Sequence, residues 1–504
     1  MTTLKHFPLG AACPDSPHAV ASSLPTMADV RGYEEKDPRV LEKLRCGYPR
    51  FVVHPFVAEL IGYYLEREAP GGRAGVLVAG DRAARDLVRH AGGSVRMESV
   101  DAGVALVHFD PDDDTATKVR KYVQHTGCGV SSRQAEDLLL AYGRRSERFA
   151  EAAYAGNAAA RVESELAGLC GCRGSDVLIC SSGMSAFFAG FSAIREFQRR
   201  RGRTRWLQLG WLYLDSGCIL KEFLGDSERL DHHYDVSDTD ALIDAIEEAG
   251  ETLAAVVVEC PTNPLARVCD LKRVAAAVRA AGGVMLVDPT LASIYNVDVL
   301  PYADILVTSL TKYAAHEGDV LAGALALNPE SPYYGDLVLE ASRHHVPPYA
   351  RDLARLAWEM EGAPAAVAAM NANAARLAKF LEAHPGVRRA YHAAEGETFG
   401  LVGRGPSTGG AIITIELRGS LEGFYDRVDV MKGPSFGTDF TLLCPFLYLA
   451  HYELVTSPEG RALLEGAGLD PELVRISVGV EDYDMLEATF ARALSLEAAD
   501  SVSK

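Results

Sequence analysis

The stretch Leu253-Ala-Ala-Val-Val-Val-Glu259 is an unbroken apolar run that ends on a carboxylate. Such a short, continuous run predicts a strand buried on both faces, because a half-exposed strand would alternate apolar and polar residues. Similar runs on either side of it alternate with amphipathic stretches, which is typical of βαβ units and a largely parallel sheet. We predict further strands over 177–180, 206–209, 284–287 and 304–307, and helices over 184–198, 238–249 and 270–281.

A second region of the chain follows Asn328 and has a different pattern. A long amphipathic stretch predicts a helix over 352–381, and later apolar runs predict strands over 410–416 and 474–478. The first part of the chain mixes helical stretches with an acidic loop at 110–115. A length of 504 residues allows about two to four domains. We divide the chain into an N-terminal extension (1–150), a large domain (151–335) and a smaller C-terminal α+β domain (336–504).

Composition and charge exclude several classes of protein. Hydrophobic residues make up 48% of the chain and charged residues 24%, which predicts a folded globular protein and not a disordered one. The chain has 50 Lys and Arg against 69 Asp and Glu, and this net charge of -19 disfavours a nucleic-acid partner. The basic run at 199–203 is more typical of a solvated helix end than of a nucleic-acid site.

The cysteines and the apolar segments indicate the cellular compartment in which we expect the protein. Ten cysteines are scattered along the chain without a CxxC pair, which predicts reduced thiols. The N-terminus lacks a basic start followed by an apolar stretch, and no window offers the roughly 18 apolar residues of a membrane helix. We therefore expect a cytoplasmic protein with no membrane partner and no metal.

Three polar elements lie where predicted strands end, and such sheets bind ligands at the carboxyl ends of their strands. Cys180-Ser-Ser-Gly-Met-Ser185 joins a strand to a helix, so its glycine and the helix N-terminus suit a single phosphate. Asp288 follows the run at 284–287, and Ser309-Leu-Thr-Lys-Tyr313 places a lysine among hydroxyls. Each element has an ordinary interpretation when it is considered alone: a strand–helix turn, an N-cap carboxylate and a surface lysine. No GxGxxG or P-loop motif supports a dinucleotide or nucleotide site.

Together the three elements supply what pyridoxal phosphate needs, namely a phosphate site, a carboxylate for the ring nitrogen and a lysine amine. The surrounding blocks resemble those of the Cys/Met metabolism family of fold-type I pyridoxal-phosphate enzymes. These blocks are Ser181-Ser-Gly-Met184, Thr262-Asn-Pro-Leu265, Asp288-Pro-Thr290 and Ser309-Leu-Thr-Lys312. The resemblance implies an α/β fold with a mainly parallel seven-stranded sheet, pyridoxal 5'-phosphate as the cofactor, and a homodimer or homotetramer.

The likeness is strongest to the fungal-type cystathionine γ-synthases and covers the chain from about Leu24 to Leu494. His125-Thr-Gly-Cys-Gly-Val-Ser-Ser-Arg133 is one of the stretches that carry it. The chain departs from the family where a Tyr-x-Arg usually reaches the phosphate of a neighbouring subunit. Tyr48-Pro-Arg50 has these letters but lies far upstream, and the region from Phe149 to Tyr154 lacks them. Either region remains open as the source of this contact.

By this resemblance, Lys312 would bind the cofactor carbonyl and move protons, and Asp288 would keep the ring nitrogen protonated. Tyr213 would stack on the ring and assist proton transfer. Arg475 would bind the substrate carboxylate through a two-point contact, and Ser435 would help to position Lys312. The remaining cofactor contacts would come from Gly183, Met184, Asn263, Thr290, Ser309 and Thr311.

The implied activity is a γ-replacement on a small amino-acid substrate. In the leading hypothesis an acylated homoserine loses its γ-leaving group to give a vinylglycine-type intermediate, to which cysteine or another thiol adds, as in trans-sulfuration. The residues after Lys312, Tyr-Ala-Ala-His316-Glu317, differ from the family. This difference favours two alternatives: secondary-metabolite chemistry with S-adenosylmethionine as donor and a carbon or nitrogen nucleophile, or a γ-lyase. A non-catalytic protein that kept the fold is the alternative from another class.

Overall fold

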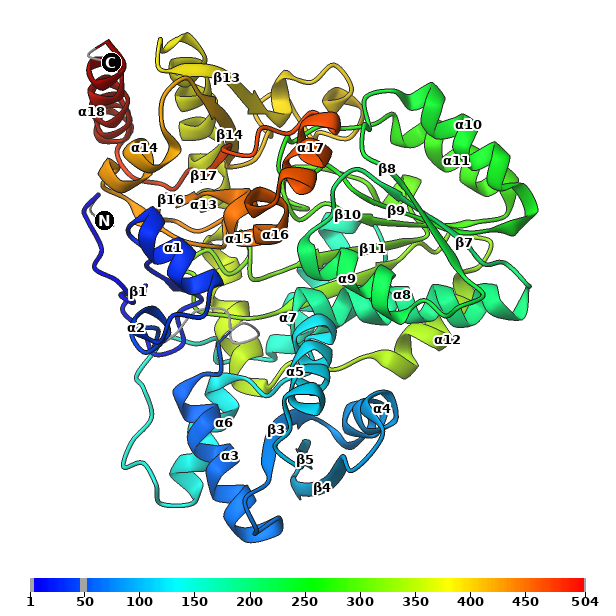
Figure 1. Ribbon diagram of the computed structural model, residues 1–504. Coiled ribbons are helices and arrows are strands. Elements are labelled where there is room, and N and C mark those ends of the chain that lie inside the picture. The colour runs from blue at the N-terminus through cyan, green and yellow to red at the C-terminus, as the bar shows by residue number, and fades with distance from the viewer. Residues whose placement is uncertain (1–3, 46–51, 503–504) are drawn as a thin grey trace.

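The computed structural model describes residues 4–45 and 52–502, and its central element is a seven-stranded sheet (Figure 1). The strand order is β6-β12-β11-β10-β9-β7-β8, and every strand is parallel to the others except β12. The prediction of a mainly parallel sheet of seven strands is confirmed. Its strands are β6 (Val177–Cys180), β7 (Arg205–Leu209), β8 (Arg229–His233), β9 (Leu253–Glu259), β10 (Val284–Asp288), β11 (Ile305–Ser309) and β12 (Gly323–Leu327).

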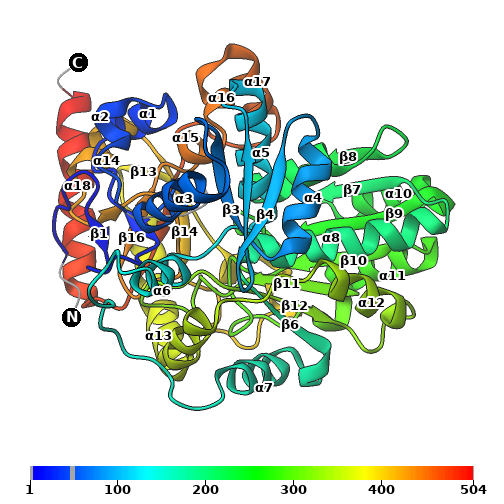
Figure 2. The ribbon, with the colours of Figure 1, turned by 90° about the horizontal axis from the view of Figure 1, so that it is seen from below.

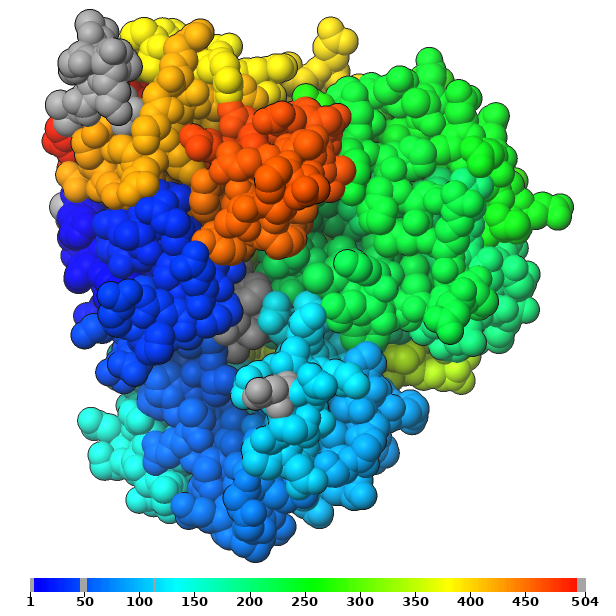
Figure 3. All heavy atoms as spheres, viewed as in Figure 1, coloured from blue at the N-terminus to red at the C-terminus, as the bar shows by residue number. Residues whose placement is uncertain are grey.

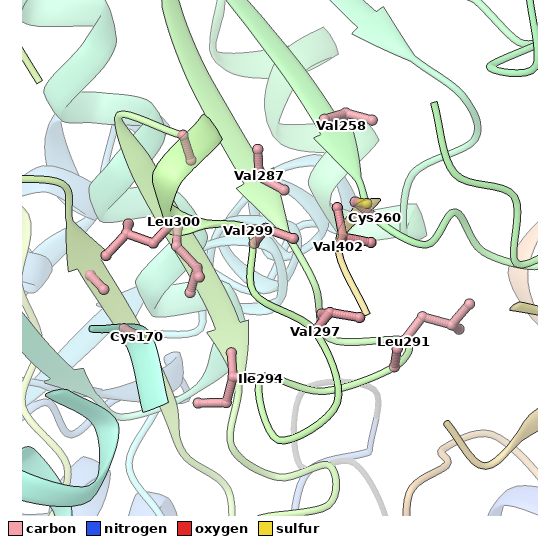
Figure 4. Close-up of a cluster of buried hydrophobic side chains, with 14 of the residues drawn as sticks. Cys170, Val258, Cys260, Val287, Leu291, Ile294, Val297, Val299, Leu300 and Val402 are labelled. Carbon is pink, nitrogen blue, oxygen red and sulfur yellow. The ribbon is translucent and has the colours of Figure 1, made fainter. Parts of the chain in front are cut away.

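Helices cover both faces of this sheet, which explains why its strands are continuously apolar. On one face pack α8 (Gly183–Arg200), α9 (Leu214–Phe223) and α12 (Tyr334–His344). The other face is covered by α7 (Ala158–Cys170), α10 (Thr239–Ala249), α11 (Leu271–Ala281) and α13 (Ala350–Ala383). Figure 4 shows part of this second layer, where Val258 and Val287 from neighbouring strands lie near Val299 and Val402 from loops.

The C-terminal part of the chain forms a five-stranded sheet of order β13-β14-β17-β16-β15. The predicted strands at 410–416 and 474–478 correspond to β14 and β17, and the predicted helix at 352–381 lies within α13. The strands are β13 (Val387–His392), β14 (Ile412–Leu417), β15 (Met431–Lys432), β16 (Leu442–Cys444) and β17 (Val474–Ser477). The helices are α14 (Leu421–Arg427), α15 (Phe446–Ala450), α16 (Tyr452–Thr456), α17 (Pro458–Gly466) and α18 (Tyr483–Val502).

Residues 4–45 contribute most of their buried apolar side chains to this C-terminal region, while His18 also contacts the segment that follows, at Ser132 and Glu136. Leu24, Met27 and Val30 share one buried cluster with Phe424 and Phe490. Figure 3 shows the dark blue N-terminal residues directly against the orange C-terminal ones. The elements involved are β1 (Ala12–Cys13), β2 (Ala21–Ser22), α1 (Met27–Glu34) and α2 (Pro38–Leu41).

A separate N-terminal unit is built on a three-stranded antiparallel sheet of order β3-β5-β4. It forms the lower part of the molecule in Figure 1 and faces the viewer in Figure 2. Its strands are β3 (Ala74–Ala79), β4 (Arg96–Asp101) and β5 (Val104–Phe109), and its helices are α3 (Pro55–Glu68), α4 (Asp81–Ala91), α5 (Asp113–Thr126) and α6 (Ser132–Ala141). The first 150 residues thus contribute to two different groups of buried clusters, joined by contacts of His18, and the division into three domains stays a prediction.

The prediction of an acidic loop over 110–115 is wrong for the second half of this range. Helix α5 begins at Asp113, because the Asp112 side chain accepts a hydrogen bond from the Thr115 backbone N–H at 2.8 Å and caps the helix. The nine cysteines in the described ranges form no disulfide. Within the same ranges, no helix combines the length and the apolar character that a membrane span requires.

Candidate active site

One cavity lies at the carboxyl ends of the parallel strands. Strands β6, β9, β10 and β11 all end at this edge of the sheet, so the polar residues that follow them meet there. Every site residue predicted from the sequence lines this cavity. They are Gly183, Met184, Tyr213, Asn263, Asp288, Thr290, Ser309, Thr311, Lys312, Ser435 and Arg475.

The turn between β6 and α8 forms a cradle at the N-terminus of a helix, a position that suits an anion. Ser182 is the N-cap of α8, and its side chain accepts the Ser185 N–H at 3.1 Å. The first backbone N–H groups of the helix are therefore left for a ligand, and the helix dipole favours a negative one. A Cβ added at Gly183 would lie 2.7 Å from the Ser309 Cβ, so only glycine allows the ends of β6 and β11 to approach this closely.

The N-terminal unit touches this cradle directly. The hydroxyls of Ser181 and Ser182 donate to the Gly127 carbonyl at 3.2 and 3.3 Å. Gly127 ends α5 in the left-handed region, with φ of 62°, and an added Cβ would lie 2.1 Å from Ser182 Oγ. This contact was not predicted, although Gly127 belongs to the 125–133 stretch that carries the subgroup resemblance.

A buried ion-pair network joins the same stretch to the loop after Lys312. Arg133, only 1% exposed, pairs with three carboxylates from distant parts of the chain. The nitrogen–oxygen distances are 2.7 Å to Glu151, 3.1 Å to Asp319 and 3.2 Å to Asp352. Because these charges are buried, each depends on the others for compensation.

Lys312 is buried beside the cradle, and its Nζ donates to Ser435 Oγ at 2.6 Å. Burial and the nearby positive charge of Arg475 lower the pKa of the Lys312 amine well below its usual value. An unprotonated amine can act as a nucleophile and can accept a proton.

Two carboxylates, the half-buried Asp288 and the buried Glu259, end neighbouring strands in register with each other. Burial raises the pKa of Asp288 to about 6, although hydrogen bonds from Thr290 lower it in part. Burial, followed by the charge of Asp288, raises the pKa of Glu259 well above its usual value. Asp288 is therefore the ionised member of the pair near neutral pH. Glu259, which accepts the Tyr213 backbone N–H, was missed as a site residue, although it ends the apolar run at 253–259 as Asp288 ends its own.

Arg475, on β17, lies in an apolar slot of the cavity. Its Nη1 donates to Asn263 Oδ1 at 3.0 Å and its Nη2 to the Ser435 carbonyl at 3.1 Å. The rings of Phe436 and Phe446 each lie 4.9 Å from the guanidinium carbon. Among the described residues that line the cavity, Lys312 and Arg475 are the only cations. The other lining side chains near them are largely apolar: Phe187, Leu214, Leu321, Phe436, Phe446 and Leu449.

Two regions, Tyr48–Arg50 and Phe149–Tyr154, were predicted as possible sources of the neighbouring-subunit phosphate contact. Tyr48 and Arg50 lie outside the described residues. In the second region, the Phe149 N–H donates to Glu136 at 2.9 Å and the Tyr154 N–H to the Ala354 carbonyl at 2.9 Å. These hydrogen bonds hold the second region against its own chain, and the source of the contact stays a prediction.

Comparisons with known proteins agree with this geometry. The sequence model of the family described as "Cys/Met metabolism PLP-dependent enzyme" matches residues 105–495. An L-2-amino-4-chloropent-4-enoate dechlorinase/desaturase from Streptantibioticus cattleyicolor is 38% identical over 95% of this chain and 97% of its own. The cystathionine γ-synthase of Neurospora crassa is 26% identical over 97% of this chain and 98% of its own. A crystal structure of cystathionine γ-synthase from Xanthomonas oryzae pv. oryzae, 24% identical, covers 68% of this chain and 87% of that one with a TM-score of 0.58, which supports the fold.

Proposed function

Because this chain belongs to the Cys/Met metabolism family of pyridoxal-phosphate-dependent enzymes, we propose that it removes a γ-substituent from a small L-amino acid with an uncharged side chain. When bound, pyridoxal phosphate supplies an electron sink that stabilises negative charge on the substrate carbons. The cavity fits this group, because the N-terminus of α8 at Gly183 and the hydroxyl side chains of Ser309 and Thr311 line it together and suit a phosphate. Asp288 would hold the ring nitrogen, and Lys312 would bind the carbonyl carbon.

The protein's own residues suit this reaction. Arg475 would bind the substrate carboxylate, since Asn263 and the Ser435 carbonyl hold its guanidinium in place. Lys312, with its lowered pKa, would accept the proton from Cα and then from Cβ. Ser435 would orient the amine through its hydroxyl. Tyr213, whose N–H is held by Glu259, would lie against the ring.

The observation that carries this proposal is the lack of a further cation among the described residues that line the cavity. The succinyl or phosphoryl group of an activated homoserine brings a second anion, and burying it without a partner would cost several kcal/mol, about 3 or more. A chlorine substituent is uncharged and apolar. The relative at 38% identity is named for L-2-amino-4-chloropent-4-enoate, and we take a haloalkenyl amino acid of this kind as the substrate. The net change is loss of a proton and a chloride ion from the side chain.

Replacement of an acyl group by a thiol is the second candidate, in keeping with the relative from Neurospora crassa, which matches 97% of this chain. Of the activated homoserines, O-acetylhomoserine fits the cavity best because its acetyl group is uncharged.

The test uses the cofactor-loaded enzyme and measures chloride release from L-2-amino-4-chloropent-4-enoate, together with a product that has lost HCl. Parallel reactions contain O-acetyl-, O-succinyl- or O-phosphohomoserine with cysteine, or S-adenosylmethionine. We expect chloride release that does not depend on a thiol and that disappears in Lys312→Ala. Turnover of O-succinyl- or O-phosphohomoserine to cystathionine, with no chloride release from the chlorinated substrate, would refute the proposal.

A further inference from the structure

A cluster of three potential metal ligands lies outside the cavity, where the N-terminal unit meets α9. His125 is in the last turn of α5, and Cys218 and Glu222 lie one turn apart on α9. Figure 1 shows α5 directly below α9, and the two helices are in contact. One ligand atom from each of the three side chains lies within 4.8 Å of the others.

A carboxylate contacts one nitrogen of the His125 ring, as is common for histidines that bind metals. His125 is 4% exposed, and its Nδ1 lies 2.9 Å from Asp215 Oδ1. Gln124 Nε2 donates to the same oxygen at 2.9 Å, which fixes the carboxylate. In histidines that bind metals, such a contact orients the other ring nitrogen toward the ion. The buried Nε2 of His125 makes no hydrogen bond to the described residues, and the Glu222 carboxylate faces it at 3.6 Å.

We propose that His125 Nε2, Cys218 Sγ and the Glu222 carboxylate bind a divalent cation of the zinc class, with water as the fourth ligand. Ligand atoms around tetrahedral zinc lie about 3.4–3.8 Å apart. The half-buried Cys218 and Glu222 side chains therefore need to close by about 1 Å from the 4.8 Å limit. Imidazole and thiolate ligands favour zinc over magnesium or calcium.

The charges around the cluster agree with a bound cation. Burial, together with the negative charges of Asp215 and Glu222, raises the pKa of the Cys218 thiol to about 12, against weaker opposing effects of Lys121 and Lys221. A cation would offset the two carboxylates and displace the thiol proton, so its affinity should increase with pH. Lys121 Nζ lies 3.7 Å from Glu222 and is the competing cation in the metal-free protein.

The position of the cluster gives the cation a structural role beside the active site. Helix α9 follows Tyr213, which lines the cavity, and Gly127, two residues after His125, accepts hydrogen bonds from the cradle serines. A cation bound here would connect the N-terminal unit to the helix that begins at Tyr213.

The experiment titrates zinc into the cofactor-loaded protein, first freed of metal by dialysis against a chelator, with a chromophoric chelator as competitor. We expect one zinc per chain, a proton released on binding, and an affinity at least tenfold lower in Cys218→Ser and in Glu222→Gln. The matched control is Cys172→Ser, which changes another half-buried cysteine and should bind zinc as the wild type does.

Glu222 is 34% exposed at its side chain, so Glu222→Gln should fold even if the cysteine variant does not. Equal zinc affinity in the wild type and in Glu222→Gln, or no stoichiometric binding by the wild type, would overturn the proposal. Because the readout is zinc binding and not turnover, its failure is distinguishable from failure of the proposed reaction.

Discussion

Replacing Asp288 by asparagine should have opposite effects on the stability of the cofactor-free protein and on its affinity for the cofactor. Burial raises the pKa of Asp288 from 3.8 to about 6. Since one pKa unit corresponds to about 1.4 kcal/mol, keeping this side chain ionised in the folded chain costs about 3 kcal/mol. The folded pKa lies above the unfolded one, so this cost is absent below about pH 4, grows as the pH rises to 6, and is complete above pH 6.

Asp288→Asn removes the charge but leaves an oxygen to accept the Thr290 N–H. The cofactor-free variant should therefore be more stable than the wild type by up to about 3 kcal/mol at pH 8 and by little near pH 4. Asparagine supplies no negative charge to a protonated ring nitrogen. Losing one partner of a buried ion pair costs about 3–5 kcal/mol, so the affinity for pyridoxal phosphate should fall about 100-fold or more.

Urea unfolding of the cofactor-free proteins at pH 8 and pH 4 measures the change in stability. Titration with pyridoxal phosphate measures the change in cofactor affinity. The control is Asp304→Asn, at a buried aspartate that accepts the Met285 N–H at 2.8 Å and does not line the cavity. That variant should leave cofactor affinity unchanged. The reasoning is refuted if Asp288→Asn destabilises the cofactor-free protein at pH 8, or if it binds the cofactor as tightly as the wild type.

Two further variants test the cradle and the buried network. Gly183→Ala places a Cβ 2.7 Å from Ser309 Cβ and should weaken cofactor binding about tenfold or more. The control is Gly168→Ala, in a helix with open space around the position. This variant should leave cofactor binding unchanged and raise the free energy of unfolding by up to about 1 kcal/mol. A titration of each variant decides this, and equal affinities would contradict the tight approach at Gly183. Arg133→Met removes a cation that three carboxylates share. Glu151 keeps Arg351 and Asp319 keeps Arg355, but Asp352 loses its ion-pair partner, so the free energy of unfolding should fall by about 3–5 kcal/mol. Arg39→Met, at an exposed ion pair, should leave the free energy of unfolding nearly unchanged, and an equally small effect of Arg133→Met would argue against the network.

The central sheet and the meeting of the predicted site residues in one cavity could be predicted from the sequence for a common physical reason. Strands covered on both faces are continuously apolar, so their ends are visible as the first polar residues after each run. Parallel strands place those ends together, and Asp288, Ser309 and Lys312 therefore meet in one cavity. Glu259 ends its run in the same way, but a single carboxylate after a strand is also an ordinary surface residue. Only the register with Asp288 shows that the two share a buried site.

The contacts that the N-terminal unit makes with the cavity could not be predicted from the ends of apolar runs. Gly127 reaches the cradle serines because α5, which it ends, packs against α8 and α9, and no local pattern in the sequence encodes that packing. The misread acidic loop has a different cause. The spacing of Asp112 and Thr115 allows an N-cap, yet a cluster of aspartates is equally typical of a solvated loop.

With a substrate carboxylate on Arg475, as proposed, the cavity would also couple substrate binding to the basicity of Lys312. Ser435 contacts both cations, since its carbonyl accepts from Arg475 and its hydroxyl accepts from Lys312. Its φ of 117° is unusual for a residue other than glycine, which indicates that its surroundings hold it in place. The positive charge of Arg475 is one of the two causes that lower the pKa of Lys312. A substrate carboxylate on Arg475 would offset that charge, so the pKa of the amine would rise and Lys312 would become a stronger base only once the substrate is bound.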